Sequence, residues 1–295
     1  MGSLWDEAGW ACAAIVTPID GAGRIDVDRL GRFGQRLMGA GLNGLVLFGT
    51  MGEGPAFPAA ERLEAAAALV DRYGFEPGRL VLGIGSCAPA ETAWLARRAG
   101  ELRLAAVLAT PPFFFRDVEQ EGVYRFYATL AEAAGRGGAP LLLYHIPQVT
   151  GVPLSVDTVA RLVEGHPEVV RGIKDSGANL PDTRALLERL DGRGAVLVGA
   201  EQHVAEAMAL GGRGTVCGMA NLIPGAMARL VAGDRDAASA AVESLGQAFE
   251  GLPVIPAVKA AVAELLGDPA WRACIPPLLP ATDEQAAALV RHAEQ

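Results

Sequence analysis

Lysine is almost absent from this chain of 295 residues. The 25 basic residues include only Lys174 and Lys259, and all the others are arginine. An arginine keeps its proton near neutral pH, whereas a desolvated lysine can lose it, and only the free amine attacks a carbonyl. Lys174 follows an apolar run in "EVVRGIKDSG" (168–177), which makes it a candidate nucleophile. An ordinary surface charge at the end of a strand is the alternative interpretation.

The chain also has few cysteines and histidines, and its net charge is negative. The net charge of −9 argues against nucleic acid as a partner, because phosphate binding needs a basic face. No metal site is expected, since no ligand spacing links the four histidines, His145, His166, His203 and His292. Reduced thiols, as in a cytoplasmic protein, are expected rather than disulfides or a zinc site because no C-x-x-C spacing joins Cys12, Cys87, Cys217 and Cys274.

Long hydrophobic runs and a basic N-terminal region are missing as well. No apolar run reaches the roughly 18 residues that a membrane span requires. The N-terminal stretch "MGSLWDEAGW" carries acidic residues and no basic residue, unlike a signal peptide. We therefore expect a soluble, cytoplasmic protein with no membrane partner, and a hydrophobic content of 51% is ample for a large core.

Eight short apolar runs alternate with segments of helical periodicity. Such continuous runs are typical of parallel strands buried on both faces, and they span residues 11–18, 44–49, 79–85, 104–112, 140–147, 169–174, 195–200 and 214–221. Asp26 and Pro58 are placed to begin the first two helices, and Gly41 and Gly74 to end them. Eight β-then-α units predict a (β/α)8 TIM barrel. A doubly wound sheet is the rival fold, weakened because no G-x-G-x-x-G follows the first run.

The remainder of the chain is helical in pattern. Residues 232–251, 253–267 and 282–295 each predict a helix. We therefore expect a barrel catalytic domain over residues 1–224 and a C-terminal helical extension over residues 225–295, packed on the barrel or on a neighbouring subunit. Lys259 falls on an expected amphipathic helix of this extension, where a structural role is predicted.

Three suggestive segments fall at the carboxyl ends of predicted strands, where (β/α)8 barrels form their active sites. They are the glycine-rich loop "GTMGEG" (49–54), Tyr144 and Lys174. The loop could direct backbone amides at an anion, and Tyr144 could pass a proton. Each also has an ordinary interpretation: a tight turn for the loop, a cap of the next helix for Glu53, and packing for Tyr144.

These segments carry a resemblance. "GLNGLVLFGTMGEG", "LLLYHIPQVTG", "VVRGIKDSG", "GGRGTVCGMANLIP" and "IPAVKAAVAELLGDPAW" resemble the dihydrodipicolinate synthase / N-acetylneuraminate lyase family of pyruvate-dependent class I aldolases. The resemblance implies a barrel with a helical tail, assembled as a homotetramer that is a dimer of dimers. It also implies that Lys174 forms a Schiff base with pyruvate or another 2-oxo acid, which then reacts with an aldehyde. No metal or organic cofactor is implied.

The resemblance further implies roles for the residues around Lys174. Tyr144 would be the proton shuttle, hydrogen-bonded to Thr50, and the backbone amides of Thr50 and Met51 would hold the substrate carboxylate. Ser176 would bind a substrate hydroxyl, with a turn or a helix cap as its alternative role. Gly49 and Val216 complete the implied substrate-binding positions.

Three positions depart from the synthases of this family. Val149 stands where those enzymes carry an arginine for a substrate carboxylate, the phenylalanines around Phe114 stand where a neighbouring subunit donates a tyrosine, and Met51 replaces a hydroxyl residue. These changes argue against condensation with aspartate semialdehyde. The segment "GIKDSG" (172–177), with Asp175 and Ser176 after the lysine, more closely resembles the sugar-acid and hydroxy-oxo-acid aldolases of the family, which implies a 2-keto-3-deoxy sugar acid or a hydroxy-oxo acid as substrate. The phenylalanines are then expected to form a subunit contact or a packing patch.

Two other functions are carried as alternatives. One is a Schiff-base-dependent 2-keto-3-deoxy sugar acid dehydratase, and the other is a barrel that binds 2-oxo acids without catalysis. Glu201 follows the seventh predicted strand and Cys217 lies on the eighth, so both could face the site. For these two, a helix N-terminal charge and a small core residue are the preferred interpretations.

Overall fold

The computed structural model describes residues 3–293, apart from the side chains of residues 236 and 237. Its centre is a closed parallel barrel in which the eight strands follow one another in chain order. The strands are β1 (Trp10–Ala14), β2 (Gly44–Leu47), β3 (Leu80–Gly83), β4 (Ala106–Ala109), β5 (Leu141–His145), β6 (Val170–Asp175), β7 (Ala195–Val198) and β8 (Gly214–Cys217). The predicted (β/α)8 barrel is therefore confirmed. The last strand ends at Cys217, earlier than expected, because Met219–Asn221 turn into a short 3-10 helix.

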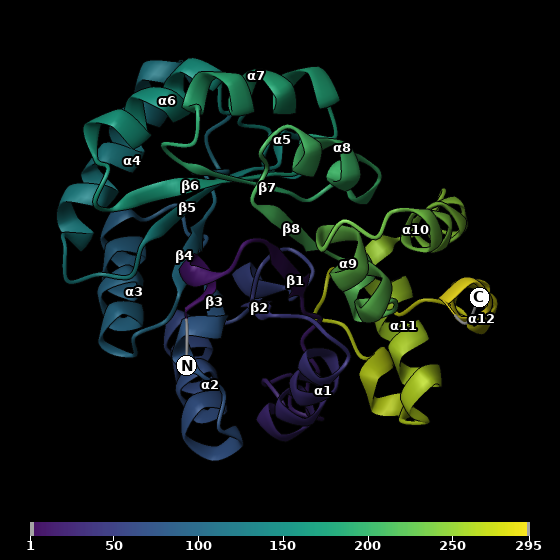
Figure 1. Cartoon of the computed structure of the whole chain (residues 1–295). Helices are drawn as coiled ribbons and strands as arrows, with labels where there is room; N and C mark the ends of the chain where they lie inside the picture. The colour runs from purple at the N-terminus through teal and green to yellow at the C-terminus, as the bar shows by residue number, and fades with distance from the viewer. Residues whose placement is uncertain (1–2, 294–295) are drawn as a thin grey trace.

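Helices surround the barrel, and three more form a group at its side (Figure 1). The surrounding helices are α1 (Val27–Gly39), α2 (Ala59–Tyr73), α3 (Pro89–Glu101), α4 (Gln120–Ala134), α5 (Pro147–Thr150), α6 (Val156–Gly165), α7 (Leu180–Leu190), α8 (Val204–Ala209) and α9 (Pro224–Val231). The group at the side is α10 (Asp236–Ala248), α11 (Val254–Leu266) and α12 (Asp283–Ala293). The division into domains at residues 224 and 225 stays a prediction.

Local sequence signals set the ends of the first helices. The Asp26 carboxylate accepts a hydrogen bond from the Arg29 backbone amide and so caps α1. Gly74 ends α2 with a left-handed φ of 68°, a conformation that glycine adopts without steric cost. Both residues act as the sequence predicts.

Alternate strand residues fill the barrel interior, as the two-residue period of a strand requires. Trp10, Leu142, Leu197 and Val216 belong to this inner cluster, and so does Tyr144. Lys174 is paired in register with Tyr144 and with Leu197, so it too faces inward. Inward-facing side chains therefore pack the barrel, and Tyr144 and Lys174 lie among them toward its carboxyl end.

A register shift in β6 places Lys174 opposite Tyr144. Leu141 pairs with Val170, but Leu142 pairs with Gly172, so Arg171 is an extra residue in the strand. This bulge moves every later residue of β6 by one position relative to β5. Without it, Ile173 would stand opposite Tyr144. The side chain of Arg171 is exposed, its guanidinium 5.1 Å from the ring centre of Trp5.

The C-terminal helices are tied to the barrel through α1. Arg29 forms an ion pair with Asp268, at 2.7 Å between Nε and Oδ2, and the rings of Phe33 and Trp271 meet edge to face. The sequence predicted an amphipathic helix around Lys259, which is wrong for α11, because residues 256–263 are all buried. Within the described part of the chain, no helix has the length and apolar character to cross a membrane.

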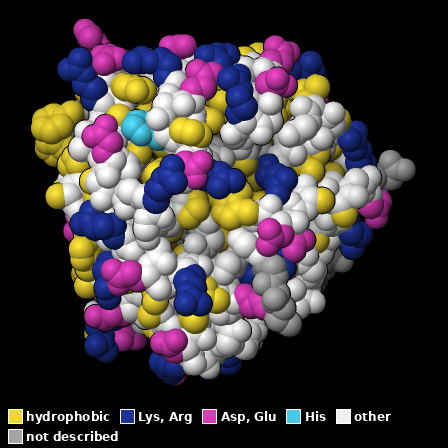
Figure 2. Space-filling view, turned by 60° about the vertical axis from the view of Figure 1, so that its left-hand side comes forward, with side chains coloured by type: hydrophobic (Ala, Val, Ile, Leu, Met, Phe, Trp, Pro, Cys, Tyr) yellow, Lys and Arg dark blue, Asp and Glu magenta, His cyan; other side chains and the backbone are white. Residues whose placement is uncertain are grey.

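Charged side chains of both signs are interspersed on the face shown in Figure 2. Arginines and acidic residues alternate over this face, and hydrophobic side chains are visible between them. No continuous basic surface forms on this side of the molecule.

Candidate active site

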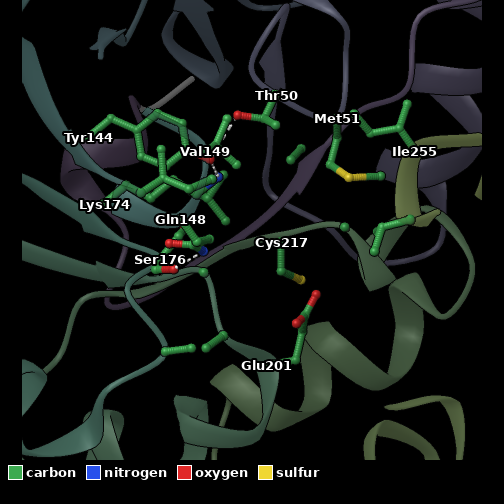
Figure 3. A pocket seen from close by; sticks show the side chains of 18 of the residues that line it. Thr50, Met51, Tyr144, Gln148, Val149, Lys174, Ser176, Glu201, Cys217 and Ile255 are labelled. Carbon is green, nitrogen blue, oxygen red and sulfur yellow. Dashed lines mark hydrogen bonds between the residues drawn. The ribbon is translucent and has the colours of Figure 1, made fainter. Parts of the chain in front are cut away.

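A cavity of about 540 Å³ opens at the carboxyl ends of the strands (Figure 3). Strand ends from around the barrel contribute to its wall, as (β/α)8 geometry dictates. Six of the predicted site residues line it: Thr50, Met51, Tyr144, Lys174, Ser176 and Val216. Gly49 does not line it, although its carbonyl accepts a hydrogen bond from Gly54 and so closes the loop that carries Thr50.

Lys174, Tyr144 and Thr50 form one connected group in the cavity wall (Figure 3). The Lys174 Nζ donates to the Tyr144 hydroxyl at 3.2 Å, and that hydroxyl lies 3.3 Å from Thr50 Oγ1. The side chains of Lys174 and Tyr144 are almost fully buried, with 4% and 2% exposed. Glycine at position 199 makes room for the lysine, because a Cβ there would lie 3.2 Å from Lys174 Cε and 1.9 Å from Ser176 Oγ.

The loop that carries Thr50 is held in an unusual backbone conformation. Phe48 and Glu53 have φ angles of 55° and 54°, which cost a non-glycine residue about 1–3 kcal/mol each. The backbone packs so closely that a Cβ at Gly54 would lie 1.7 Å from the Phe48 carbonyl oxygen, and one at Gly83 would lie 2.2 Å from it. Glycine is therefore needed at both positions for this loop to approach the barrel.

Glu53 anchors the same loop to the C-terminal helices. Its Oε1 accepts from Lys259 Nζ at 2.5 Å, and its Oε2 accepts from the Ile275 backbone amide at 2.7 Å. The prediction that Glu53 caps the following helix is wrong, because its side chain makes no such hydrogen bond. Both side chains of the ion pair are buried, at 0% and 2% exposure. The structural role expected for Lys259 thus includes support of the loop beside the cavity.

Glu201 and Cys217 also line the cavity and point toward one another (Figure 3). The preferred interpretations from sequence are confirmed, because Glu201 begins a short 3-10 helix and Cys217 is buried in the core, but both side chains also face the cavity. Glu201 Oε1 accepts from the Met219 amide at 3.1 Å. Burial raises the pKa of the Glu201 carboxyl above its usual range, although backbone amides and Lys174 oppose the shift. Burial likewise raises the pKa of the Cys217 thiol.

The wall formed by α5 shows one of the predicted departures, Val149, and a second departure, Phe114, lies outside the cavity. Val149 lines the cavity and remains 53% exposed, beside Gln148, whose Nε2 donates to the Ser176 carbonyl at 2.7 Å. Phe114 does not line this cavity. It is 77% exposed and lies with Phe115 in the segment between β4 and α4.

Behind Lys174, polar residues fix the turn that follows β6. The Asp175 carboxylate accepts from the Gly177 amide at 3.0 Å and from the Thr183 hydroxyl at 2.6 Å. His145 Nδ1 accepts from the Leu154 amide at 3.1 Å, and burial lowers the pKa of this imidazole while Asp175 opposes that shift. Among residues 3–293, no three His, Cys, Asp or Glu side chains group so as to hold a metal ion.

Fold and cavity together define the class of protein. It is a (β/α)8-barrel enzyme that places an amine in contact with a phenol at the carboxyl end of its strands, next to a loop of backbone amides. Such a pair suits covalent catalysis on a carbonyl, because the phenol can exchange protons while the amine makes and breaks its bond.

Comparison with known proteins gives the family. Residues 9–295 match the profile described as the Dihydrodipicolinate synthetase family, and the chain belongs to this family. It is therefore a carbon–carbon lyase of the class I aldolase type, as the resemblance implied.

Individual proteins of known sequence or structure match this chain over most of its length. An uncharacterized DapA-like lyase of Chloroflexus aurantiacus is 29% identical over 290 residues, which cover 94% of this chain and 93% of the relative. A 4-hydroxy-tetrahydrodipicolinate synthase of Aromatoleum aromaticum is 35% identical over 221 residues, covering 74% of this chain and 73% of that enzyme. The crystal structure of dihydrodipicolinate synthase from Agrobacterium tumefaciens superposes with a TM-score of 0.91 at 29% identity, covering 98% of this chain and 99% of that one.

Proposed function

We propose that the protein is a Schiff-base-forming aldolase that joins pyruvate, or a related 2-oxo acid, to an aldehyde, or cleaves the corresponding hydroxy-oxo acid. The observation that carries this proposal is the contact between Lys174 Nζ and the Tyr144 hydroxyl, 3.2 Å apart in the wall of an open cavity. An amine that reacts with a keto carbon needs a neighbouring group to move protons, and Tyr144 is in contact with it.

The reaction is balanced without any further reagent. The Lys174 amine attacks the keto carbon C2 of the 2-oxo acid, and the keto oxygen leaves as water once Tyr144 has passed it a proton. Loss of a proton from C3 gives an enamine, whose C3 bonds to the aldehyde carbon while the aldehyde oxygen takes a proton. Water then adds to C2 and the C2–N bond breaks, which releases a 4-hydroxy-2-oxo acid and the free amine.

The loop that begins at Gly49 would receive the substrate carboxylate. In this proposal the backbone amides of Thr50 and Met51 point toward that carboxylate, as oriented amides in such loops bind anions. Ser176, on the opposite side of Lys174, takes the hydroxyl that forms at C4. The imine on Lys174 serves as the electron sink, so the proposal requires neither a metal nor an organic cofactor.

Dehydration of a 2-keto-3-deoxy sugar acid is the second candidate, and Glu201 favours it. The raised pKa of this carboxyl keeps it protonated to higher pH than an ordinary glutamate, and it lines the cavity. An enamine at C3 could expel the hydroxyl at C4, which would leave as water with the Glu201 proton. Pyruvate among the products separates the two reactions, because only aldol cleavage releases it.

Borohydride trapping tests the proposal. The protein is incubated with pyruvate, reduced and digested, and we expect a mass increase on the peptide that contains Lys174. The peptide that contains Lys259 is an internal control, since these are the two lysines of the chain and Lys259 is fully buried. Lys174→Met should abolish the adduct and turnover. An adduct with longer 2-oxo acids but not with pyruvate would favour the dehydratase, and none with any 2-oxo acid would refute imine chemistry.

A further inference from the structure

The outer part of the cavity, away from Lys174, is walled by apolar side chains. Met51 and Ile255 lie across the cavity from Lys174 and Tyr144 (Figure 3). Val149 on α5, Val254 at the start of α11, and Leu278 continue this wall. The 2-oxo acid would occupy the end near Lys174, so these residues surround the place of its reaction partner.

Charge in the cavity is poorly suited to an anionic partner. Of the described residues that line it, Lys174 alone is basic, and imine formation uses its amine. The acidic residue in the wall is Glu201. A carboxylate or phosphate at the outer end would therefore meet no cationic fork of the kind that arginine supplies.

The cavity wall also contains the polar side chains of Gln148, Glu201 and Gln202, and the first two are occupied within the protein. Gln148 donates its amide to the Ser176 carbonyl at 2.7 Å, and Glu201 Oε1 accepts from the Met219 amide at 3.1 Å. The hydroxyl at C4 of an aldol product can be satisfied by Tyr144 or Ser176. Further hydroxyls on C5 and C6 would face the apolar wall, where an unpaired polar group loses its hydrogen bonds to water.

From these three observations we propose that the enzyme takes an apolar aldehyde, aliphatic or aromatic, as the partner of the 2-oxo acid. The product is then a 4-hydroxy-2-oxo acid with an apolar substituent on C4, formed by the same bond between enamine C3 and the aldehyde carbon. A cavity of about 540 Å³ has room for pyruvate and such a substituent together. This inference rests on the proposed aldolase function and chooses between the two substrate classes that the sequence left open.

Matched aldehydes test it directly. Propanal and D-glyceraldehyde have the same carbon skeleton and differ in two hydroxyls, and butanal and succinic semialdehyde differ in a terminal carboxylate. With pyruvate in excess, we expect kcat/KM to be at least about tenfold higher for the apolar member of each pair, and benzaldehyde to be accepted. Equal or reversed preferences would overturn the inference.

The variant Val149→Arg gives the second arm, with Leu279→Arg as its control. Leu279 is 79% exposed and does not line the cavity, so it receives the same charge outside it. Val149→Arg should lower the ratio of butanal to succinic semialdehyde by about tenfold or more, whereas Leu279→Arg should leave it unchanged. An unaltered ratio in Val149→Arg would contradict the assignment of this wall to the aldehyde.

Trapping with pyruvate distinguishes a failure of the proposed function from a failure of the proposed substrate class. No adduct on Lys174 would refute the proposed function itself. An adduct together with preference for the hydroxylated or anionic aldehydes would refute only the apolar substrate class.

Discussion

Tyr144 connects the reactive amine to the loop that would bind the substrate carboxylate. Its hydroxyl is within 3.2 Å of Lys174 Nζ and 3.3 Å of Thr50 Oγ1, and its ring lies 4.4 Å from the same Nζ. The phenol can therefore pass a proton at the keto oxygen and at the aldehyde oxygen without moving far. The aromatic ring also screens the amine from bulk water.

Removal of this hydroxyl should affect chemistry more than folding. We expect Tyr144→Phe to lower kcat by about 10²–10⁴-fold, the usual contribution of a positioned acid–base group. Tyr127→Phe is the control, because Tyr127 is a buried tyrosine whose hydroxyl donates to the Ala109 carbonyl at 2.9 Å outside the cavity. Steady-state rates and thermal unfolding of both variants check this. A similar loss of kcat in both would point to a general effect of core polarity.

Glu201 should make the folded protein less stable as the pH rises. Its pKa is raised on folding by burial, so the folded state holds a proton that the unfolded state has lost. The associated stability is complete below the ordinary pKa of a glutamate and is lost as the pH rises through the folded pKa. Glu201→Gln keeps the side-chain shape but cannot ionise. Its Tm relative to the wild type should therefore increase between pH 4 and pH 8, and a constant or falling difference would contradict the prediction.

At the scale of elements, α11 and the loop of residues 49–54 behave as one unit. They lie far apart in the sequence, yet the Glu53–Lys259 ion pair joins them in the protein interior. The same helix supplies Val254 and Ile255 to the cavity wall. The C-terminal extension is thus part of the construction of the active site.

Breaking this ion pair should be costly because it leaves one charge buried alone. We expect Lys259→Met to lower the free energy of unfolding by about 3–5 kcal/mol and to slow imine formation with pyruvate. The double variant Glu53→Gln/Lys259→Met should lose less than the sum of the single changes, by about 1–3 kcal/mol. Arg24→Met breaks an exposed pair with Asp20 and should cost far less, because exposed ion pairs contribute little to stability. Urea unfolding of Glu53→Gln, Lys259→Met, the double variant and Arg24→Met measures these changes. Strictly additive losses for Glu53→Gln and Lys259→Met would argue against an energetic coupling between the two residues.

Most elements of the barrel could be predicted because their apolar runs are continuous and their caps are local. The meeting of Tyr144 and Lys174 could not be predicted in the same way, since it depends on the extra residue Arg171 in β6. The sequence placed both residues at strand ends, but pairing register is a property of two strands together. The sequence did not predict the ion pair of Glu53 either, because its partner Lys259 is 206 residues away in the chain and no local pattern joins them. The Glu201 side chain faces the cavity because of the turn after β7, and no local sequence signal marks this turn.

At the scale of the whole molecule, two exposed phenylalanines form a candidate contact between copies of the chain. Phe114 and Phe115 are 77% and 69% exposed, and their rings meet edge to face. Burial of such side chains between subunits would contribute about 1.5–3 kcal/mol each. The homotetramer that the family resemblance implies would place this segment in a subunit contact.

Replacement of both phenylalanines tests the assembly. We expect Phe114→Ser/Phe115→Ser to shift the particle mass from a tetramer to smaller species, measured by light scattering after size-exclusion chromatography. Leu279→Ser, at a site that is 79% exposed, should leave the mass unchanged. A tetramer that persists in the double variant would remove this segment from the interface.

The burial of both lysines gives the protein an unusual chemical surface. Lys174 is 4% exposed and Lys259 is fully buried, so no ε-amino group stands free on the exterior. Lysine-directed acylation, glycation or enzymatic conjugation would therefore reach Lys174 alone of the two lysines, and only through the cavity mouth. Label that an amine reagent places on a lysine of the folded protein would therefore report on whether the cavity is open.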